Sequence, residues 1–580
     1  MKKIILIITL LLCLNVTLFA KPNIHYAEIP HAEQWQEEHP GELPIWLTEE
    51  EKLHLDEIGK DFRPTLEPPG PVRQPSEFDP MQGVLIRYPL GISTAIVAEM
   101  AEDVIVYCVV SSGSQTTAYN TFNNAGVNMS NVEFLITSSD SYWIRDYGPW
   151  FIFNGNNEAG ITNFTYNRPR PNDNAIPTFC ATYFGISVYN MGLTATGGNY
   201  MTDGHGISVS TDLIWEENPS LTHAEINTLV EDYLGIETYH VVPDVNGEYI
   251  KHVDCWGKYL SPTQILIREV PTYHSQYDEI EAAVDYFEAQ PSCYGTNYEV
   301  PRVNTPNNQP YTNSLILNNK VLVPITGSAY DAPAIASCES AMPGYEVLGF
   351  TGSWQSTDAL HCRAMGVTDQ GMLYIYHIPL ADTISTSDDI NITASIFAYS
   401  GQALISDSLS VYWKRSTDIH FSALPLHQIF GNFFSASIPA QLNETIINYY
   451  IHAADNSGRS ENNPYIGAPM AYSFYVVNSV SVDEPQQNMI TEATNYPNPF
   501  SGNTTIAFTL KNHTSDDIKI GIYNVRGQLV KILSAQSGNE LVTAQWDGSD
   551  QSGKSVPAGV YFYRINLGGI TFTQKMMKVR

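Results

Sequence analysis

The stretch "LTHAEINTLVEDYLG" (residues 221–235) decides the fold class, because it is typical of a helix while the runs around it are typical of strands. Thr222 can cap the start of this helix, and Gly235 can end it. Apolar runs that suit buried strands lie on both sides, such as "DVIVYCVV" (103–110) and "LILNNKVLVP" (315–324). Strands mixed with helices in one region predict an α/β domain.

The length of 580 residues favours several domains over one core. The N-terminus has two lysines, an apolar run and then Ala20, which is the pattern of a secretory signal peptide. Short, partly alternating runs replace the mixed pattern after about residue 376, and they predict β-sandwiches. We expect a signal peptide at 1–20, a pro-segment or N-terminal arm at 21–60, the α/β domain at 61–376, an immunoglobulin-like sandwich at 377–476, a polar linker at 477–494 and a small sandwich at 495–580.

The charge of the chain narrows its partners. There are 61 acidic residues against 29 lysines and arginines, which gives a net charge of −32. Such a chain repels nucleic acid and anionic membrane surfaces, and it suits a cationic substrate. No stretch after the signal is long and apolar enough to predict a membrane span.

Six cysteines follow the signal peptide, and they are spread over more than 250 residues. Small disulfide scaffolds carry cysteines far more densely, so one or two disulfides are left open without assigned pairs. The absence of a CxxC pair gives no support to a structural zinc site.

Four stretches concentrate residues that could react. Asp146 lies in "YWIRDYGPW" (142–150), between tryptophans and ahead of a Gly-Pro turn, where a carboxylate can be desolvated and aimed. His252 and Asp254 lie in "YIKHVDCW", and on a strand their spacing would put both side chains on one face, with Cys255 on the other. The remaining two stretches are "PYTNSLIL" (310–317) and "DALHCRAMG" (358–366).

Cys362 stands between His361 and Arg363, and nearby positive charge favours the thiolate form of cysteine. A thiolate, a histidine and two carboxylates make a coherent set for attack on a cationic carbon. Each residue alone also has an ordinary structural explanation. Asp146 could pair with Arg145, a lone histidine is usually structural, and an isolated secreted cysteine is usually packed or disulfide-bonded. The chemical interpretation is favoured because all the pieces occur together in one α/β domain.

Another unusual stretch is "YNRPRPND" (166–173), which places Arg168 and Arg170 between prolines in an acidic chain. It predicts either a solvated basic loop or a clamp for an anionic group. Arginine suits a planar, paired contact with a carboxylate better than lysine does.

The C-terminal segment resembles the sorting domains of bacterial type IX secretion substrates. The matching pieces are "YPNPF", "IYNVRGQLV", "WDG", "AGVYFYR" and the basic end "KMMKVR". The resemblance covers about 85 residues. It implies export across the outer membrane and either release or attachment to the cell surface. The alternative is an ordinary adhesive β-module.

Roughly residues 60–375 resemble the secreted bacterial type of peptidylarginine deiminase, which belongs to the guanidino-group-modifying enzymes and is related to agmatine deiminases. The carrying motifs are "MQGVLIRYP", "WIRDYGPW", "TGGNYMTDG", "HVDCWGKYL", "TNSLILNNKVLVP" and "ALHCRAMG". The resemblance implies the pentein fold, a five-bladed α/β propeller. The periodicity of the sequence alone does not show it.

The resemblance assigns catalytic roles residue by residue. Cys362 would be the nucleophile, and His252 the general acid and base. Asp146 and Asp254 would hold the guanidinium of the substrate, and Asn313 would support the catalytic group. The sequence matches the family at each of these positions.

The same resemblance assigns four binding residues. Trp143 and Tyr249 would line the substrate site, while Arg168 and Arg170 would bind the C-terminal carboxylate of a peptide. The implied reaction converts arginine to citrulline with release of ammonia, through a covalent cysteine thiouronium. It prefers the C-terminal arginine of peptides and proteins.

The implied enzyme needs no metal or other cofactor for catalysis, and a structural calcium ion on acidic loops is left open. Its partners would be arginine-containing peptides or proteins and the type IX secretion machinery, with no nucleic acid, and the chain would be a monomer. Two other functions stay open: an agmatine or free-arginine deiminase, and a non-catalytic surface adhesion protein. A cysteine protease is less favoured, because no protease motif surrounds Cys362 and Asp146 and Asp254 would have no task.

Overall fold

The structure is a computed structural model. It describes residues 35, 37, 42–247, 249–385, 388–441, 443–477, 490–510, 518–524, 529–535, 541–567 and 570–579. The chain divides into two compact units, residues 1–478 and 479–580. The expected signal peptide lies outside the described residues, as do the early part of the expected pro-segment and most of the linker. Within the described residues, none of the helices is both long and apolar enough to cross a membrane.

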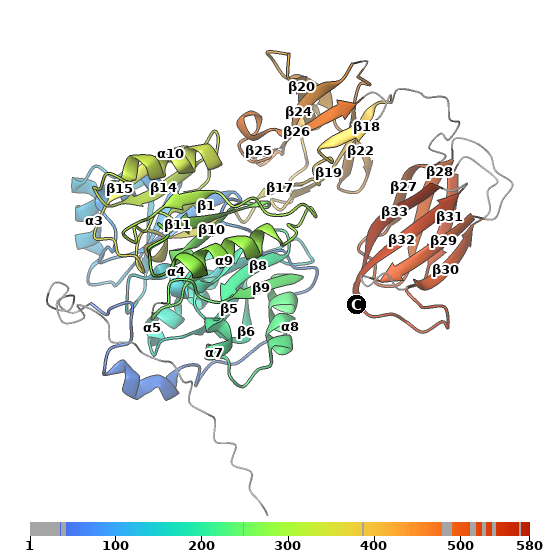
Figure 1. Cartoon of the computed structure of the whole chain (residues 1–580). Coiled ribbons are helices and arrows are strands. Elements are labelled where there is room, and N and C mark those ends of the chain that lie inside the picture. The colour runs from blue at the N-terminus through green and yellow to red at the C-terminus, as the bar shows by residue number, and fades with distance from the viewer. Residues whose placement is uncertain are drawn as a thin grey trace, which may run out of the picture. The chain divides into compact units, whose positions relative to one another are not determined.

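Five small sheets of the same construction form the α/β part of the first unit (Figure 1). In each, the first two strands pair antiparallel and the second and third pair parallel. In that order the strands are β4 (Trp150–Phe153), β5 (Ala159–Tyr166) and β6 (Ser187–Ala195); β7 (Met201–Thr202), β8 (Ile207–Thr211) and β9 (Thr238–Val242); β10 (Gly257–Ser261), β11 (Gln264–Glu269) and β12 (Arg302–Asn304); β13 (Leu315–Leu317), β14 (Lys320–Ile325) and β15 (Glu346–Thr351); and β16 (Met365–Thr368), β1 (Met81–Arg87) and β2 (Ile105–Val110), with β3 (Val132–Ile136) added parallel at the edge.

Helices link the parallel strands of each sheet, since a parallel pair needs a crossover connection. The main crossover helices are α2 (Thr94–Asp103), α6 (Ile176–Phe184), α8 (His223–Leu234), α9 (Tyr277–Glu288) and α10 (Asp331–Ala341). Helix α3 (Gln115–Asn124) links β2 to β3, and the short helices α5 (Pro171–Asn174) and α7 (Leu213–Glu217) precede α6 and α8. Helices α9 and α10 pack on strands of their own sheets, as Figure 1 shows. The α/β class predicted from the sequence is therefore confirmed.

Helix α8 has the ends that the sequence predicts. The Thr222 side chain accepts from the backbone N–H of Glu225, and the Glu225 side chain accepts from the backbone N–H of Thr222. This reciprocal pair is a capping box, which satisfies two otherwise unpaired donors. Gly235 ends the helix at a φ of 72°, in the left-handed region that favours glycine.

The sheet that contains β1 takes its antiparallel strand, β16, from the C-terminal end of the α/β part. Strand β16 pairs with β1 across almost 280 residues of sequence, with Leu85 opposite Met365. The pairing ties the beginning of the α/β part to its end. The number of sheets equals the number of blades that the resemblance implies, and their closure into one ring stays a prediction.

Strand β2 is buried on both faces. Along β2, Val106, Cys108 and Val110 belong to one hydrophobic cluster, while Tyr107 and Val109 belong to another. Successive side chains of a strand point to opposite faces, so both faces of β2 are covered. This explains why the run reads as continuously apolar rather than alternating.

Two further sheets follow from Leu373 onward and share one core that includes Ile392, Trp413 and Tyr449. The first contains β17 (Leu373–Tyr376), β19 (Ile390–Ala398), β23 (Phe433–Ile438) and β22 (His427–Phe430). The second contains β18 (Thr383–Ser385), β26 (Tyr472–Val477), β24 (Thr445–Ala454), β20 (Ser410–Arg415) and β21 (Ser422–Pro425), with β25 (Ser460–Asn463) paired to β24. Arg459 forms an ion pair of 2.5 Å with Asp369, which joins these sheets to the α/β part.

The second unit also contains two sheets with a common core, formed by Ile506, Ile520, Trp546 and Tyr563 among others. One sheet contains β27 (Ile490–Tyr496), β28 (Thr504–Leu510) and β31 (Leu541–Trp546). The other contains β30 (Leu529–Ala535), β29 (Ile518–Asn524), β32 (Gly559–Leu567) and β33 (Ile570–Lys578).

No disulfide links any two of the six cysteines that follow the expected signal peptide. Five of them are buried, and Cys293 is partly exposed. The disulfides that the sequence left open are therefore not formed among these residues.

Candidate active site

The expected catalytic residues occupy equivalent places in four of the five sheets. Every sheet has a short turn ahead of its first, antiparallel strand, and these residues lie on the turns or, for His252, directly ahead of one. These turns are α4 (Ile144–Tyr147) before β4, η3 (Gly197–Asn199) before β7, η4 (Val253–Cys255) before β10, the residues around Asn313 before β13, and η5 (His361–Arg363) before β16. Turn α4 contacts η3 and η5, and η3 contacts η4, so residues far apart in the sequence meet in one cluster.

The expectation that His252 and Asp254 lie on a strand is wrong. His252 is the N-cap of the 3₁₀ turn η4, and strand β10 begins only at Gly257. The turn is held by a side chain instead of a neighbouring strand, because the backbone N–H of Val253 donates to Asn199 Oδ1 at 3.3 Å. Cys255 is buried, as expected, with its Sγ 3.6 Å from Asp254 Oδ1.

Cys362, Asn313 and Asp254 are in direct contact. Asn313 Nδ2 donates to Cys362 Sγ at 3.3 Å, and the sulfur lies 3.8 Å from Asp254 Oδ2. Asn313 Oδ1 accepts from the backbone N–H of His361 at 3.0 Å and from that of Cys362 at 3.4 Å. The asparagine thus fixes the turn that carries the thiol, and it also touches the sulfur.

His252 and Asp146 face each other with 3.7 Å between Nδ1 and Oδ1, too far for a hydrogen bond. Among the described residues, neither ring nitrogen of His252 has a hydrogen-bond partner, and neither does Asp146 Oδ1. Buried polar atoms without partners are rare and call for an explanation. They offer a donor and acceptors to a polar group entering the site.

Gly198 closes this part of the site. A Cβ atom at this position would lie 2.5 Å from His252 Nδ1 and 2.8 Å from Asp146 Oδ1. Only glycine therefore leaves the imidazole and the carboxylate where they are. The motif "TGGNYMTDG" signalled this region, but the sequence did not show which side chains the glycine accommodates.

Burial controls the protonation of the cluster. It raises the pKa of Asp146 well above the ordinary value, and the charge of Asp254 adds to the effect. Burial lowers the pKa of His252 to about 4. It also raises the pKa of the Cys362 thiol well above the ordinary value, with further contributions from Asp254, Asp358 and Asp146. Burial therefore favours the neutral forms of the thiol, the imidazole and the Asp146 carboxyl in the site at rest.

The expectation that Arg363 and His361 favour the Cys362 thiolate is wrong for this resting state. Arg363 is engaged by Asp358 through two contacts of 2.6 and 2.8 Å. His361 lies between two carboxylates. The neighbouring positive charges are thus neutralised by closer partners, while the carboxylates around the sulfur disfavour a negative thiolate.

Asp254, by contrast, is charged, because His361 compensates it. His361 Nδ1 lies 2.7 Å from Asp254 Oδ2, and His361 Nε2 lies 2.6 Å from Glu77 Oε2. Each ring nitrogen of His361 thus meets a carboxylate oxygen. Burial would raise the pKa of Asp254, but the hydrogen bond and charge of His361 outweigh it and the pKa is lowered.

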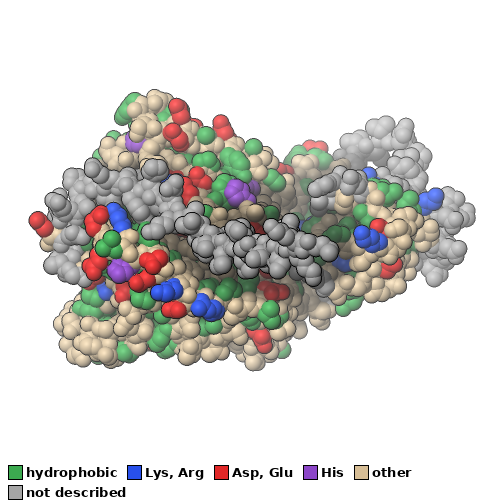
Figure 2. Space-filling model, turned by 90° about the horizontal axis from the view of Figure 1, so that it is seen from below, with side chains coloured by type: hydrophobic (Ala, Val, Ile, Leu, Met, Phe, Trp, Pro, Cys, Tyr) green, Lys and Arg blue, Asp and Glu red, His purple; other side chains and the backbone are tan. Residues whose placement is uncertain are grey.

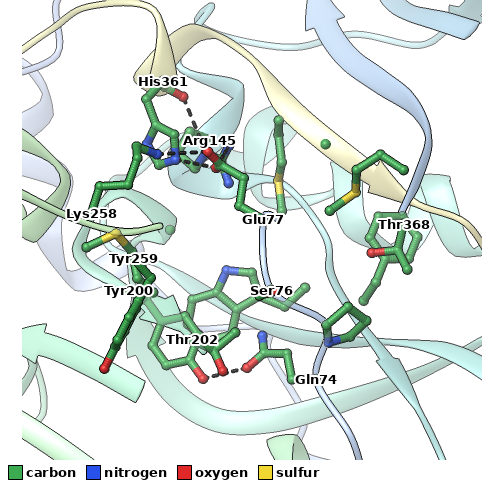
Figure 3. Close-up of a pocket in the computed structure, with 18 residues that line it drawn as sticks. Gln74, Ser76, Glu77, Arg145, Tyr200, Thr202, Lys258, Tyr259, His361 and Thr368 are labelled. Carbon is green, nitrogen blue, oxygen red and sulfur yellow. Dashed lines mark hydrogen bonds and ion pairs between the residues drawn. The ribbon is translucent and has the colours of Figure 1, made fainter. Parts of the chain in front are cut away.

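Glu77 completes a chain of buried charges that the sequence did not reveal (Figure 3). Lys258 Nζ lies 2.8 Å from Glu77 Oε1, and Arg145 Nη2 lies 2.8 Å from Glu77 Oε2. Burial alone would raise the pKa of Glu77, but His361, Lys258 and Arg145 hold it well below the ordinary value. Arg145 therefore does not pair with Asp146, which was the structural alternative for that carboxylate.

Figure 3 shows this cluster at one end of a cavity of about 80 Å³. His361, Glu77, Arg145 and Lys258 belong to its lining, whereas Cys362 and the other expected site residues do not. The stretch "SEFDP" (76–80), just before the first strand, was the only sequence signal for Glu77, and nothing in it distinguishes that glutamate from an ordinary surface residue.

The four expected binding residues meet the N-terminal segment of the chain. Arg170 is 1% exposed, which excludes the solvated loop for this side chain, and Arg168 is half-buried. Both donate to atoms of residues 44–51. Trp143 and Tyr249 each lie beside a tryptophan of the same segment.

No group of three or more histidine, cysteine, aspartate or glutamate side chains within the described part of the chain is arranged to hold a metal ion. The structural calcium ion on acidic loops, which the sequence left open, stays open.

We predict that Glu77→Gln destabilises the α/β part by about 3–5 kcal/mol at neutral pH, because it leaves the buried charges of Lys258, Arg145 and His361 short of a counter-charge. Urea denaturation checks this, with Glu281→Gln as the matched control. Glu281 pairs with Arg302 on the surface, at 33% and 22% exposure, so its loss should cost at most about 1 kcal/mol.

The pH dependence of this difference has a definite sign. The pKa of Glu77 is depressed in the folded state, so its contribution is complete above the ordinary value of 4.5 and is lost as the pH falls through the depressed value. The gap in stability between the native chain and Glu77→Gln should therefore shrink in acid. A gap that is small at neutral pH, or that does not shrink in acid, would contradict the buried charge chain.

Comparisons with known proteins cover both ends of the chain. Residues 494–579 match the model of the secretion system C-terminal sorting domain, so this end directs the chain through type IX secretion to the cell surface or the extracellular space. The secretion machinery is therefore one partner of the chain.

Similar proteins include the agmatine deiminase of Pseudomonas syringae pv. syringae, 25% identical over 270 residues, which are 39% of this chain and 73% of the relative. The agmatine deiminase of Ectopseudomonas mendocina is 24% identical over 262 residues, which are 38% of this chain and 71% of the relative. Among solved structures, the agmatine deiminase of Enterococcus faecalis aligns at 18% identity and a TM-score of 0.47, covering 52% of this chain and 96% of that one.

Residues 73–367 match the model of the Porphyromonas-type peptidyl-arginine deiminase family. The matched range contains all five sheets of the α/β part and every residue of the site cluster. The chain therefore belongs to the Porphyromonas-type peptidyl-arginine deiminase family.

Proposed function

We propose that this chain hydrolyses the guanidinium group of arginine to citrulline and ammonia, and that it prefers arginine at the C-terminus of peptides and proteins. Cys362, His252, Asp146, Asp254 and Asn313 would carry the reaction. The observation that supports it most is the direct contact of the thiol with Asn313 and Asp254, next to a carboxyl and an imidazole whose polar atoms lack partners. That set suits a planar cation with several N–H donors.

The guanidinium would bind between Asp254 and Asp146. Paired, charge-assisted hydrogen bonds to carboxylates match its planar geometry. At rest only Asp254 carries charge, so the entering cation would favour loss of the proton from Asp146. The same cation would stabilise a thiolate on Cys362, where the surrounding carboxylates disfavour one now. Substrate binding itself would thus activate the nucleophile.

The chemistry follows from these positions. Cys362 would transfer its thiol proton to His252, and the sulfur would bond to the guanidinium carbon. His252, now an imidazolium, would protonate one nitrogen; the C–N bond breaks and ammonia leaves. A water molecule, losing a proton to His252, would attack the thiouronium carbon. The C–S bond then breaks, and the thiolate is released with the urea group of citrulline.

The preference for a C-terminal arginine rests on Arg168 and Arg170, with Trp143 and Tyr249 beside the substrate chain. The charge of Arg168 acts on both Asp146 and His252, which places it within electrostatic reach of the reacting groups. Prolines 169 and 171 limit the freedom of the backbone between the arginines. Agmatine lacks the carboxylate that this pair would bind.

An agmatine or free-arginine deiminase is the second candidate, because the relatives at 24–25% identity are agmatine deiminases. A purely adhesive protein is disfavoured by the buried cluster of partnerless polar atoms, which adhesion does not require. We further propose that the five sheets close as a five-bladed propeller, that the sheet pairs at 377–476 and 495–580 are sandwiches, and that a monomer without a catalytic cofactor is the active form.

We predict that a peptide ending in a free arginine carboxylate is deiminated at least tenfold more efficiently, in kcat/KM, than its C-terminal amide or agmatine. Citrulline or ureido-product formation measures this. Arg168→Ala should raise KM for the free acid and leave the amide nearly unchanged. Equal rates on acid and amide would remove the carboxylate preference, and a faster rate on agmatine would favour the second candidate.

We predict that binding of the guanidinium releases a proton from Asp146. Since the pKa of Asp146 is raised in the free protein, the affinity for a peptide with C-terminal arginine should increase as the pH rises toward that value. Calorimetry on Cys362→Ala, in buffers of different ionisation enthalpy, measures the proton count without turnover. Asp146→Asn should abolish the proton release. Asp254→Asn should weaken binding but leave the proton release unchanged. Unchanged proton release in Asp146→Asn would contradict this assignment.

We predict that Gly198→Ala lowers kcat by about 10²-fold, because the added methyl group displaces His252 or Asp146 by a fraction of an ångström to about 1 Å. Gly247→Ala is the matched control, since a Cβ there meets no atom within 4 Å. Gly247 has a φ of 64°. Its replacement by alanine therefore strains the backbone without causing a clash, and it controls for a small loss of stability. An unchanged kcat in Gly198→Ala would show that His252 and Asp146 need not hold these positions.

A further inference from the structure

The reacting groups are closed off from solvent in this chain. Cys362 and Asp254 have no exposed surface, and Asn313, Asp146 and His252 are 1–2% exposed. A peptide cannot reach them unless a covering element moves. The described residues 42–58, which precede the α/β part, lie on the residues expected to bind the far end of the substrate.

This N-terminal segment supplies a carboxylate to Arg170. Glu51 Oε1 accepts from Arg170 Nε at 2.7 Å, and Glu51 Oε2 lies 3.4 Å from Arg170 Nη2. The Glu51 carboxylate is held in place by Thr48, whose backbone N–H donates to it at 2.8 Å. Burial would raise the pKa of Glu51, but Arg170 and Thr48 lower it, so the carboxylate is ionised.

Backbone carbonyls of the same segment accept hydrogen bonds from both arginines. Arg170 Nη2 donates to the carbonyls of Pro44 at 2.6 Å and Trp46 at 3.2 Å. Arg168 Nη2 donates to the carbonyl of Ile45 at 3.2 Å. The carbonyls of three successive residues, Pro44, Ile45 and Trp46, thus accept hydrogen bonds from the two arginines.

Aromatic contacts extend the interface to the other two expected binding residues. The ring of Trp46 meets that of Tyr249 edge-on at 6.2 Å between centroids. Trp35 lies 6.2 Å from Trp143 and 5.5 Å from Trp46. Trp35 and Trp46 are 8% and 7% exposed, so this contact is part of a hydrophobic core and not a loose surface association.

The geometry points to a polypeptide-binding surface, formed by Arg168, Arg170, Trp143 and Tyr249, whose resident occupant is the N-terminal segment of the same chain. The segment competes with peptide substrates for this surface and keeps the precursor latent until it is displaced or cut away. This inference rests on the proposed function for its substrate, but the contacts themselves do not depend on it.

Removal of the segment would leave the sheets of the α/β part intact. The short helix η1 (Glu51–Glu57) ends it, and Lys60 and Asp61 after it are exposed. The view from below in Figure 2 faces the side on which this blue helix lies in Figure 1, and charged side chains of both signs are interspersed there. Cutting at Lys60 would separate the segment from the α/β part without breaking any strand.

The test weakens the segment in the full-length chain. Glu51→Gln and, independently, Trp46→Ala should each raise kcat/KM for a peptide with C-terminal arginine by about tenfold or more, mainly through KM, because the open form becomes more populated. Glu49→Gln is the control, since the Glu49 side chain is 91% exposed and pairs with Lys52 of the same segment. No rise in either variant would overturn the inference.

A second measurement does not depend on catalysis. Alkylation of Cys362 by iodoacetamide, followed by mass spectrometry, should be faster by a similar factor in Glu51→Gln and Trp46→Ala. Cys293, partly exposed and remote in sequence, serves as the internal reference whose rate should not change. A synthetic peptide of residues 42–58 should slow the alkylation again.

The two measurements separate the claims. Faster alkylation without any citrulline from any substrate would leave the latent surface standing and refute the proposed function. Turnover in the native chain, with alkylation and kcat/KM unchanged by both substitutions, would refute the latent surface and leave the proposed function standing.

Discussion

The buried charge of Asp254 is the constraint on which the site depends. A carboxylate without exposed surface is costly unless it is paired and hydrogen-bonded. His361 provides that partner through one ring nitrogen, and its other ring nitrogen meets a second carboxylate, that of Glu77. Glu77 in turn forms ion pairs with Lys258 and Arg145. One charge close to the thiol thus fixes a chain of groups that reaches the cavity in Figure 3.

The five similar sheets explain how such a chain can be assembled. Each contributes one turn ahead of its antiparallel edge strand, and the turns meet. Asp146, Asp254 and Cys362 are therefore placed by backbone packing in three different sheets. The first sheet is completed by β16, so the turn with Cys362 is positioned only when both ends of the α/β part have come together.

Sequence reasoning predicted the features that local chemistry or a motif determines. The ends of helix α8 follow from Thr222 and Gly235 alone, and motif matches brought together Cys362, Asn313 and Asp254. It failed where tertiary contacts override local pattern. The spacing of His252 and Asp254 suits a strand, but the Asn199 side chain holds a 3₁₀ turn there. The charges beside Cys362 suggested a thiolate, but their own partners neutralise them.

Glu77 and the N-terminal segment could not be predicted for a different reason. A glutamate in a proline-rich stretch carries no signal of burial, since its burial comes from Lys258, Arg145 and His361, each distant in sequence. Likewise, Glu51 lies in a charged helix that reads as a solvated face, and only the fold brings Arg170 to it. The positions of Glu77 and Glu51 both depend on pairing with charges that are distant in sequence. The periodicity of a sequence does not reveal such pairs.

Under the proposed function, two controls would act on opposite ends of an arginine. At the guanidinium end, the raised pKa values of the Cys362 thiol and of Asp146 would keep the resting site unreactive until a cation enters. At the carboxylate end, the N-terminal segment holds the arginines that a peptide would need. A small guanidine without a carboxylate would not need Arg168 and Arg170. It would still have to activate the thiol, and the N-terminal segment would hinder only its entry to the site. The segment would therefore compete most strongly against the substrates that the two arginines are proposed to select, and the same pair of side chains would link latency and specificity.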